Sequence, residues 1–104
     1  MLTTASTGLM KVLADPLRLR IVTLLAGETL CTSHLVAETG ARQTNLSNHL
    51  RVLREAGVVD TEACGRFTYY RLRPEGLACL AGHFAELAES AHTTAVLDRR
   101  RPCP

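Results

Sequence analysis

The chain lacks several features that would assign it to other classes of protein. No apolar run approaches the roughly 20 residues that a membrane-spanning helix needs. Residues 1–9 are rich in Thr and Ser and lack the basic and long apolar segments of a secretory signal peptide. No internal repeat, low-complexity tract or linker interrupts the 104 residues. We therefore expect one cytoplasmic domain that does not contact a membrane, in a compartment where thiols stay reduced.

Lysine is nearly absent, and eleven of the twelve basic residues are arginine. The formal net charge is only +2, but this charge is unevenly distributed. Residues 41–73 hold six arginines and three acids, which gives +3, and the rest of the chain carries −1. A modest basic region on a nearly neutral globular body is typical of a specific DNA-binding protein rather than of a non-specific polycation.

Residues 43–57 carry the most informative pattern of the chain. Leu46, Leu50 and Leu53 have the spacing of a helix with one buried face. The opposite face carries amides, hydroxyls and arginine instead of the usual Glu and Lys. Such side chains can read base edges in a major groove, where amides pair with adenine and arginine pairs with guanine. The predicted DNA-contacting residues of this recognition helix are Arg42, Gln43, Thr44, Asn45, Ser47, Asn48, His49 and Arg51.

The remaining pattern predicts a winged helix-turn-helix. Asp15-Pro16 begins the second helix, and Gly65 is the turn between two segments rich in β-branched and aromatic residues. The predicted helices span residues 9–14, 17–26, 32–40, 43–57 and 74–91, and the predicted strands span residues 58–62 and 67–72. The order α-α-α-α-β-β-α is mainly α with a small β-hairpin. Arg66 at the tip of this wing would contact a phosphate or a minor groove.

The expected organisation is one domain for DNA binding and dimerisation over residues 1–97, followed by a flexible, Cys-containing tail over residues 98–104. In so small a domain, the apolar stripes of the first and last helices have little else to pack against. We therefore expect a homodimer that binds two half-sites of an imperfect palindrome in double-stranded DNA.

Three motifs together resemble the ArsR/SmtB family of metalloregulatory repressors. They are Ala14-Asp15-Pro16-Leu17-Arg18, Ser47-Asn48-His49-Leu50, and Gly65-Arg66 followed by Tyr69-Tyr70. The resemblance covers residues 9–91 and implies a homodimeric repressor that leaves its operator when an inducer binds, often a toxic metal or metalloid. One departure is Arg42, because the family usually has Ser at this N-cap, and losing such a cap costs about 1 kcal/mol.

The resemblance also indicates where metal ligands would lie. Arsenic, lead and cadmium sensors of the family begin the third helix with Leu-Cys-x-Cys-Asp-Leu, where this chain keeps Cys31 but has Ser33 and His34. A single thiolate leaves that site incomplete. Zinc, nickel and cobalt sensors of the family carry their ligands on the last helix, where this chain has no usable ligand at Pro74, Gly76, Leu87 and Ser90. A cysteine pair that other members carry in the recognition helix is replaced here by Val52 and Ala56.

The chain has four cysteines and no Cys-x-x-Cys pair. Cys31 precedes a predicted helix N-terminus, where the helix dipole stabilises a thiolate, and Cys79 has the position of a small core residue. As(III) takes three thiolates, and soft thiolate sites favour such ions. The candidate ligands are Cys31, Cys64 at the wing and Cys103 in the tail, from one or both protomers. The expected inducer is As(III), with Sb(III), Cd(II) and Pb(II) as alternatives, and Zn(II) if His34 also binds.

Two other functions remain open from the sequence. A repressor of the same fold could respond to oxidants or sulfide by bridging two cysteines. An enzyme using Cys31 and His34 as nucleophile and base is disfavoured, because no cleft or oxyanion element accompanies them; we therefore expect no enzymatic activity and no catalytic cofactor. Among the other histidines, His49 is expected to be structural or to contact DNA, and His83 and His92 to be solvated.

Overall fold

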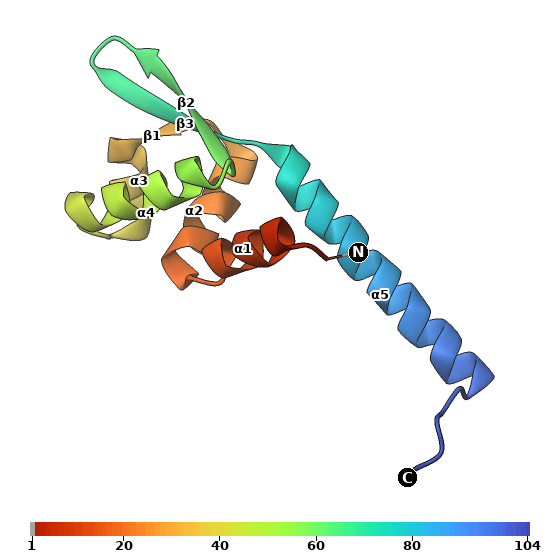
Figure 1. Ribbon diagram of the computed structural model, residues 1–104. Helices are drawn as coiled ribbons and strands as arrows, with labels where there is room; N and C mark the ends of the chain where they lie inside the picture. The colour runs from red at the N-terminus through yellow and green to blue at the C-terminus, as the bar shows by residue number, and fades with distance from the viewer. Residues whose placement is uncertain (1) are drawn as a thin grey trace.

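A computed structural model describes residues 2–104. The helices are α1 (Thr4–Leu13), α2 (Pro16–Gly27), α3 (Thr32–Thr39), α4 (Gln43–Glu55) and α5 (Pro74–Leu97), and the strands are β1 (Leu30–Cys31), β2 (Val59–Cys64) and β3 (Phe67–Leu72). The sheet is antiparallel with the order β1-β3-β2. In Figure 1 the β2–β3 wing projects from one end of the helical body, and α5 extends away from the other side. This arrangement confirms the predicted winged helix-turn-helix.

Local sequence signals set the ends of the helices that position α4. The Asp15 carboxylate accepts hydrogen bonds from the backbone N–H groups of Leu17 (2.9 Å) and Arg18 (3.0 Å), and Pro16 opens α2. Gly57 follows the C-cap of α4 with a φ of +76°, and the N–H of Val58 donates to the carbonyl of Leu53 at 3.0 Å. This Schellman motif ends the helix and turns the chain directly into the wing.

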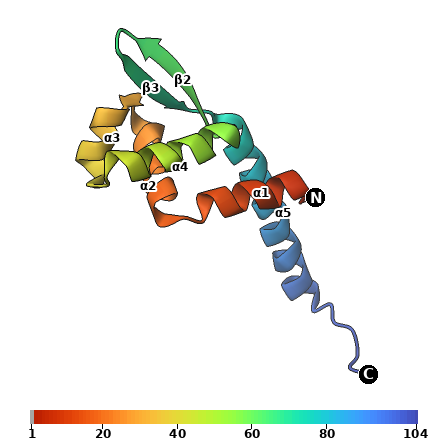
Figure 2. The same cartoon turned by 60° about the vertical axis from the view of Figure 1, so that its left-hand side comes forward.

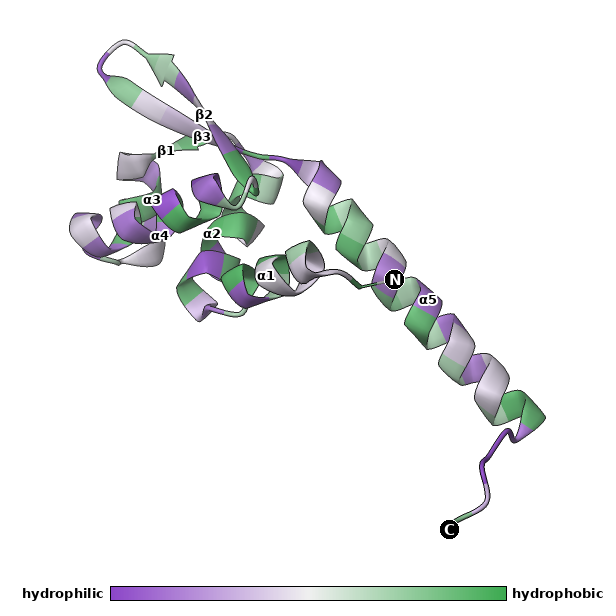
Figure 3. Cartoon of the chain, viewed as in Figure 1, coloured by the Kyte–Doolittle hydropathy of each residue, from purple (hydrophilic) through white to green (hydrophobic). Residues whose placement is uncertain are grey.

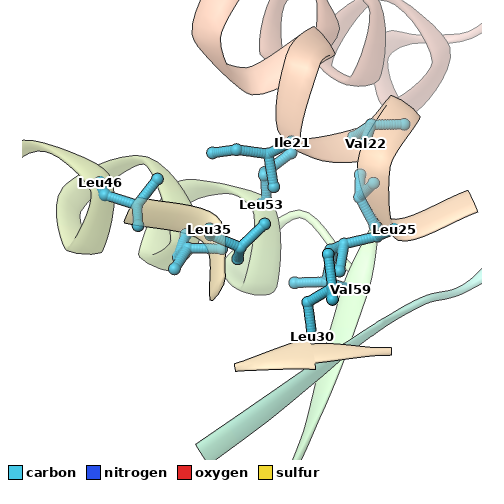
Figure 4. Packing of buried hydrophobic residues seen from close by; sticks show 10 residues of the cluster. Ile21, Val22, Leu25, Leu30, Leu35, Leu46, Leu53 and Val59 are labelled. Atoms are coloured by element: carbon cyan, nitrogen blue, oxygen red, sulfur yellow. The ribbon is translucent and has the colours of Figure 1, made fainter. Parts of the chain in front are cut away.

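The core lies between α2, α3, α4 and the base of the wing. Ile21, Leu35, Leu46 and Leu53 are 0% exposed and Leu50 is 1% exposed. Figure 4 shows labelled side chains from α2, α3, α4, β1 and β2 meeting in this cluster. Because three leucines of α4 are buried in it, the helix cannot rotate about its axis, and its opposite face is fixed toward solvent.

The largest differences from the sequence-based prediction concern the sheet and the first and last helices, while the other element ends shift by one or two residues. The predicted hairpin is part of a three-stranded sheet, because Leu30 pairs with Tyr70 and Cys31 with Tyr69. The first helix begins at Thr4 instead of residue 9, since the Thr3 hydroxyl caps it by accepting from the N–H of Ser6 at 3.2 Å. The last helix continues to Leu97 instead of ending near residue 91.

Helix α5 leaves much of its apolar surface uncovered. Leu80 is its one buried residue, at 6% exposure, whereas Phe84 is 47% and Leu87 is 55% exposed. Figure 2 shows α1 crossing beside the first half of α5, and in Figure 3 apolar residues recur along the rest of α5. Residues 99–104 have no regular secondary structure. Across the described residues 2–104, no helix has both the length and the apolar character to cross a bilayer.

Candidate nucleic-acid interface

The face of α4 opposite its buried leucines is open and polar. The side chains predicted to read base edges are all exposed: Gln43, Thr44, Asn45, Ser47, Asn48 and Arg51. They belong to a helix whose buried face is fixed by the core. A rigid helix with amides, hydroxyls and arginine directed outward has the donors and acceptors that base pairs present in a major groove.

Several arginines near this face have no acidic partner in the part of the chain that the structure describes. Arg42, the N-cap of α4, is exposed and its side chain makes no capping hydrogen bond. Arg51, Arg54 and the wing residue Arg66 are likewise exposed, and within residues 2–104 no salt bridge or hydrogen bond occupies their guanidinium groups. Arg54 was not among the predicted contacts, although its position next to Arg51 in a basic segment could have indicated it.

Arg71 on the wing differs from these arginines. Its guanidinium donates to Asp60 at 3.0 Å and to Glu62 at 3.2 Å. The hydrogen bond to Asp60, together with the charge of that carboxylate, raises the pKa of Arg71. Because two carboxylates offset this charge locally, the free positive charge of the wing lies at Arg66.

His49 points into the protein instead of toward the open face of α4. Its side chain is 19% exposed, and its Nδ1 lies 3.1 Å from Nη1 of Arg18 and 4.0 Å from Oδ1 of Asp15. Arg18 also donates to the carbonyl of Val12 at 2.6 Å. Of the two roles expected for His49, these contacts favour the structural one, which ties α4 to the start of α2.

Cys31 lies beside this interface. It is the N-cap of α3 and is 5% exposed, and its backbone N–H donates to Nδ1 of His34 at 3.2 Å. The His34 ring meets Tyr69 edge-on with a centroid distance of 6.0 Å. Because Nδ1 is engaged by the backbone, His34 is not arranged as a base for the Cys31 thiol. A groove of about 290 Å³ is lined by Cys31, Thr32, Ser33, Gln43, Arg66, Phe67 and Thr68.

The three candidate metal ligands do not meet within one chain. Cys31 pairs with Tyr69 and Cys64 with Phe67, on opposite sides of β3. With strands about 4.8 Å apart and about 3.4 Å per residue, the Cα atoms of these cysteines are roughly 12 Å apart. Cys103 follows α5, and Figure 1 shows the C-terminus far from the wing. In the described residues, no three His, Cys, Asp or Glu side chains form a group that could hold a metal ion.

The expectations for Cys79 and His83 were wrong. Cys79 is exposed instead of being a core residue, and its Sγ lies 3.6 Å from Nε2 of His83. His83 is half-buried and is therefore not simply solvated, whereas His92 is exposed as expected. The four-residue spacing of Cys79 and His83 on a helix could have indicated the pair.

Comparison with known proteins identifies the family. Residues 15–61 match the family described as "Bacterial regulatory protein, arsR family". A solved structure of a possible transcriptional regulator for arsenical resistance is 40% identical, with a TM-score of 0.69, over 88% of this chain and 95% of that one. The chain belongs to the ArsR family. The predicted family resemblance is therefore confirmed.

Two other relatives extend the comparison for this ArsR-family protein. The biofilm growth-associated repressor of Agrobacterium fabrum is 42% identical over 72 residues, which is 69% of this chain and 62% of the relative. The arsenic resistance transcriptional regulator ArsR1 of Pseudomonas putida is 42% identical over 66 residues, 62% of this chain and 52% of the relative. The chain thus spans little more than half the length of these relatives. One is named as a repressor and the other as a transcriptional regulator, in agreement with the expected class.

Proposed function

We propose that this ArsR-family protein is a sequence-specific transcriptional repressor that binds double-stranded DNA and leaves its operator when a thiophilic ion binds. The observation that carries the proposal is the outward face of α4, where exposed amides, hydroxyls and Arg51 stand opposite three buried leucines. The unpaired Arg42 and Arg66 flank this face and supply charge for phosphates. A protein acting on the chromosome in this way is expected in the cytoplasm.

The proposed active form is a homodimer. A compact protein of 11.3 kDa exposes about 5,700 Å², whereas this chain exposes 7477 Å². Its radius of gyration is 18.1 Å, against about 13 Å for a compact chain of this size. The excess surface includes the apolar side chains of α5, so a second copy would cover it. Two recognition helices would then read half-sites of an imperfect palindrome about 34 Å apart.

For the inducer we propose a thiophilic ion held by Cys31, with As(III) favoured and Sb(III), Cd(II), Pb(II) and Zn(II) as alternatives. The names of the P. putida relative and of the solved homologue refer to arsenic. Cys31 shares its groove with Gln43, the first residue of α4, and with Arg66 of the wing. An ion bound there therefore changes the surroundings of two proposed DNA contacts. The remaining thiolates, Cys103 and Cys64, would come from a second copy, because Cys64 of the same chain lies roughly 12 Å from Cys31.

A redox-responsive or sulfide-responsive repressor is the second candidate. Cys64 and Cys103 are exposed free thiols, and such thiols can be oxidised to an interchain bridge. The two candidates differ in stoichiometry, because As(III) would occupy three thiolates per ion, whereas a bridge consumes two thiols and needs no ion.

DNA binding is tested by gel shift and footprinting with matched variants. Asn48→Ala or Gln43→Ala should reduce the preference for operator over unrelated DNA by about 1–3 kcal/mol, because a base contact is lost. Arg66→Ala should weaken binding to both DNAs and lower the salt slope by about 0.9, the value for one phosphate contact. Arg100→Ala removes the same charge far from α4 and should change neither. Binding without sequence preference or salt dependence would contradict the proposal.

The inducer is tested by release of DNA on adding As(III). Ligand binding should weaken operator affinity about 5- to 150-fold, the usual range for coupling between sites. Cys31→Ser should keep operator binding and lose this response, whereas the control Cys79→Ser should keep both. If a protein with Ser at positions 31, 64 and 103 still released DNA with As(III), Sb(III) or Cd(II), the proposed thiolate site would be wrong.

A further inference from the structure

Helix α5 carries a thiol–imidazole pair away from the proposed DNA interface. Cys79 and His83 are one turn apart, and Sγ lies 3.6 Å from Nε2. Cys79 is exposed in the chain. It lies about 140° around the helix axis from Phe84, so the two side chains are on different sides of α5.

The pair opens onto an apolar cavity between α1 and α5. The cavity measures about 300 Å³, and its walls include Ala5 and Leu9 of α1 and Leu80 of α5, with Cys79 and His83 at one side. The two helices meet closely at one end, where a Cβ added to Gly76 would lie 3.1 Å from Cδ2 of Leu9. The space is large enough for a small organic molecule and is lined mainly by hydrocarbon.

We propose that Cys79 and His83 form a covalent modification site for small, apolar α,β-unsaturated carbonyl compounds. The thiol proton passes to Nε2, and Sγ forms a bond to the β-carbon as the carbon–carbon π bond breaks. The displaced electron pair forms an enolate, and the imidazolium returns the proton to the α-carbon. The net reaction is an addition with no leaving group and no oxidant, so the two side chains supply every proton that moves.

The composition of the site favours a carbon electrophile over a metal ion. Cys79 and His83 provide two ligands, and across residues 2–104 no third His, Cys, Asp or Glu completes a group with them. The walls of Ala5, Leu9 and Leu80 offer hydrocarbon contact and no charge to a bound molecule. A soft thiol beside an apolar wall matches a soft, uncharged electrophile.

The chain provides its own reference thiols for the experiment. Cys64 and Cys103 are also exposed, and in the described structure neither has an imidazole hydrogen-bond partner. The full-length reduced protein is treated with less than one equivalent of N-phenylmaleimide, and the initial rate at each cysteine is measured by peptide mass spectrometry. Cys79 should react about tenfold or more faster than Cys64 and Cys103, a modest part of what positioned acid–base groups supply in enzymes.

Two comparisons separate the contributions of the imidazole and of the cavity. His83→Gln should lower the rate at Cys79 to that of Cys64, while the matched control His92→Gln, on the same helix, should leave it unchanged. A maleimide carrying a carboxylate, with the same reactive double bond, should lose most of the preference for Cys79. The proposal is overturned if Cys79 reacts no faster than the other two thiols, if both histidine variants behave alike, or if the charged probe retains the preference.

Discussion

Asp15 links the start of α2 to the recognition helix at the scale of single side chains. The hydrogen bond from the backbone N–H of Arg18 lowers the pKa of Asp15 below its ordinary value of 3.8, and nearby His49 and the N–H of Leu17 act in the same direction. Folding therefore favours the ionised carboxylate. The stability that this group contributes is present above the pKa of the unfolded chain and is lost as the pH falls through the lower pKa of the folded state.

Asp15→Asn tests this contribution, because the amide oxygen can still cap α2 but carries no charge. The free energy of unfolding of the wild type should exceed that of the variant at about pH 6, and the difference should shrink toward about pH 3. Urea unfolding at a fixed protein concentration measures both values. Glu89→Gln, an exposed carboxylate on α5, should show no such pH-dependent difference. If the difference in the free energy of unfolding between wild type and Asp15→Asn stayed constant across this pH range, the proposed linkage would be wrong.

The sequence predicted the polar face of α4 better than it predicted the thiols. Leu46, Leu50 and Leu53 fix that face through helical periodicity alone, and the exposure of the residues between them follows. The surroundings of Cys31 and Cys79 depend instead on which distant element covers them. Cys31 is buried where β1 meets β3, and Cys79 is exposed because α1 leaves a cavity at that point.

At the scale of elements, the turn at Gly57 sets the direction of the wing relative to α4. Its φ of +76° lies in the left-handed region, which costs other residues roughly 1–2 kcal/mol. Gly57→Ala should lower the free energy of unfolding by that amount, which corresponds to a midpoint about 4–8 °C lower per kcal/mol. Thermal unfolding followed by circular dichroism measures the change.

Gly82→Ala is the matched control, because Gly82 lies inside α5 and an added Cβ would meet nothing within 4 Å. Alanine loses less backbone freedom than glycine on folding, so this variant should be more stable by about 0.5–1 kcal/mol. The same substitution should therefore have opposite signs at the two positions. Equal effects would mean that the left-handed turn does not strain alanine.

The elements that the sequence missed or shortened depend on tertiary contacts. Strand β1 has two residues, too few to show a period of two, and it exists because Leu30 and Cys31 pair with Tyr70 and Tyr69. By contrast, Asp15-Pro16, Gly57 and Gly65 mark boundaries through local backbone chemistry, and the structure has element ends at each of them. Pairing partners that are distant in sequence leave no such local signal.

At the scale of the whole molecule, α5 extends from the helical body as an arm with an exposed apolar surface. The principal extents of 63 × 23 × 23 Å describe an elongated chain. No element within residues 2–104 covers Phe84, Val96 or Leu97, which are 47%, 70% and 57% exposed. Association through α5 would bury this surface and would fix the separation of two recognition helices. Dimerisation and operator affinity are then parts of one equilibrium.

Phe84→Asp should shift this equilibrium toward the monomer, because it introduces a charge into the proposed contact without changing α4. Sedimentation equilibrium should show a monomer, and operator affinity should fall about 100-fold or more, since the second half-site is no longer held at high effective concentration. Thr93→Asp adds the same charge to the opposite side of α5 and should remain dimeric with near wild-type affinity. Binding to a single half-site should be nearly equal for the two variants, because both keep the recognition helix intact. A Phe84→Asp protein that stays dimeric would move the proposed interface away from this part of α5.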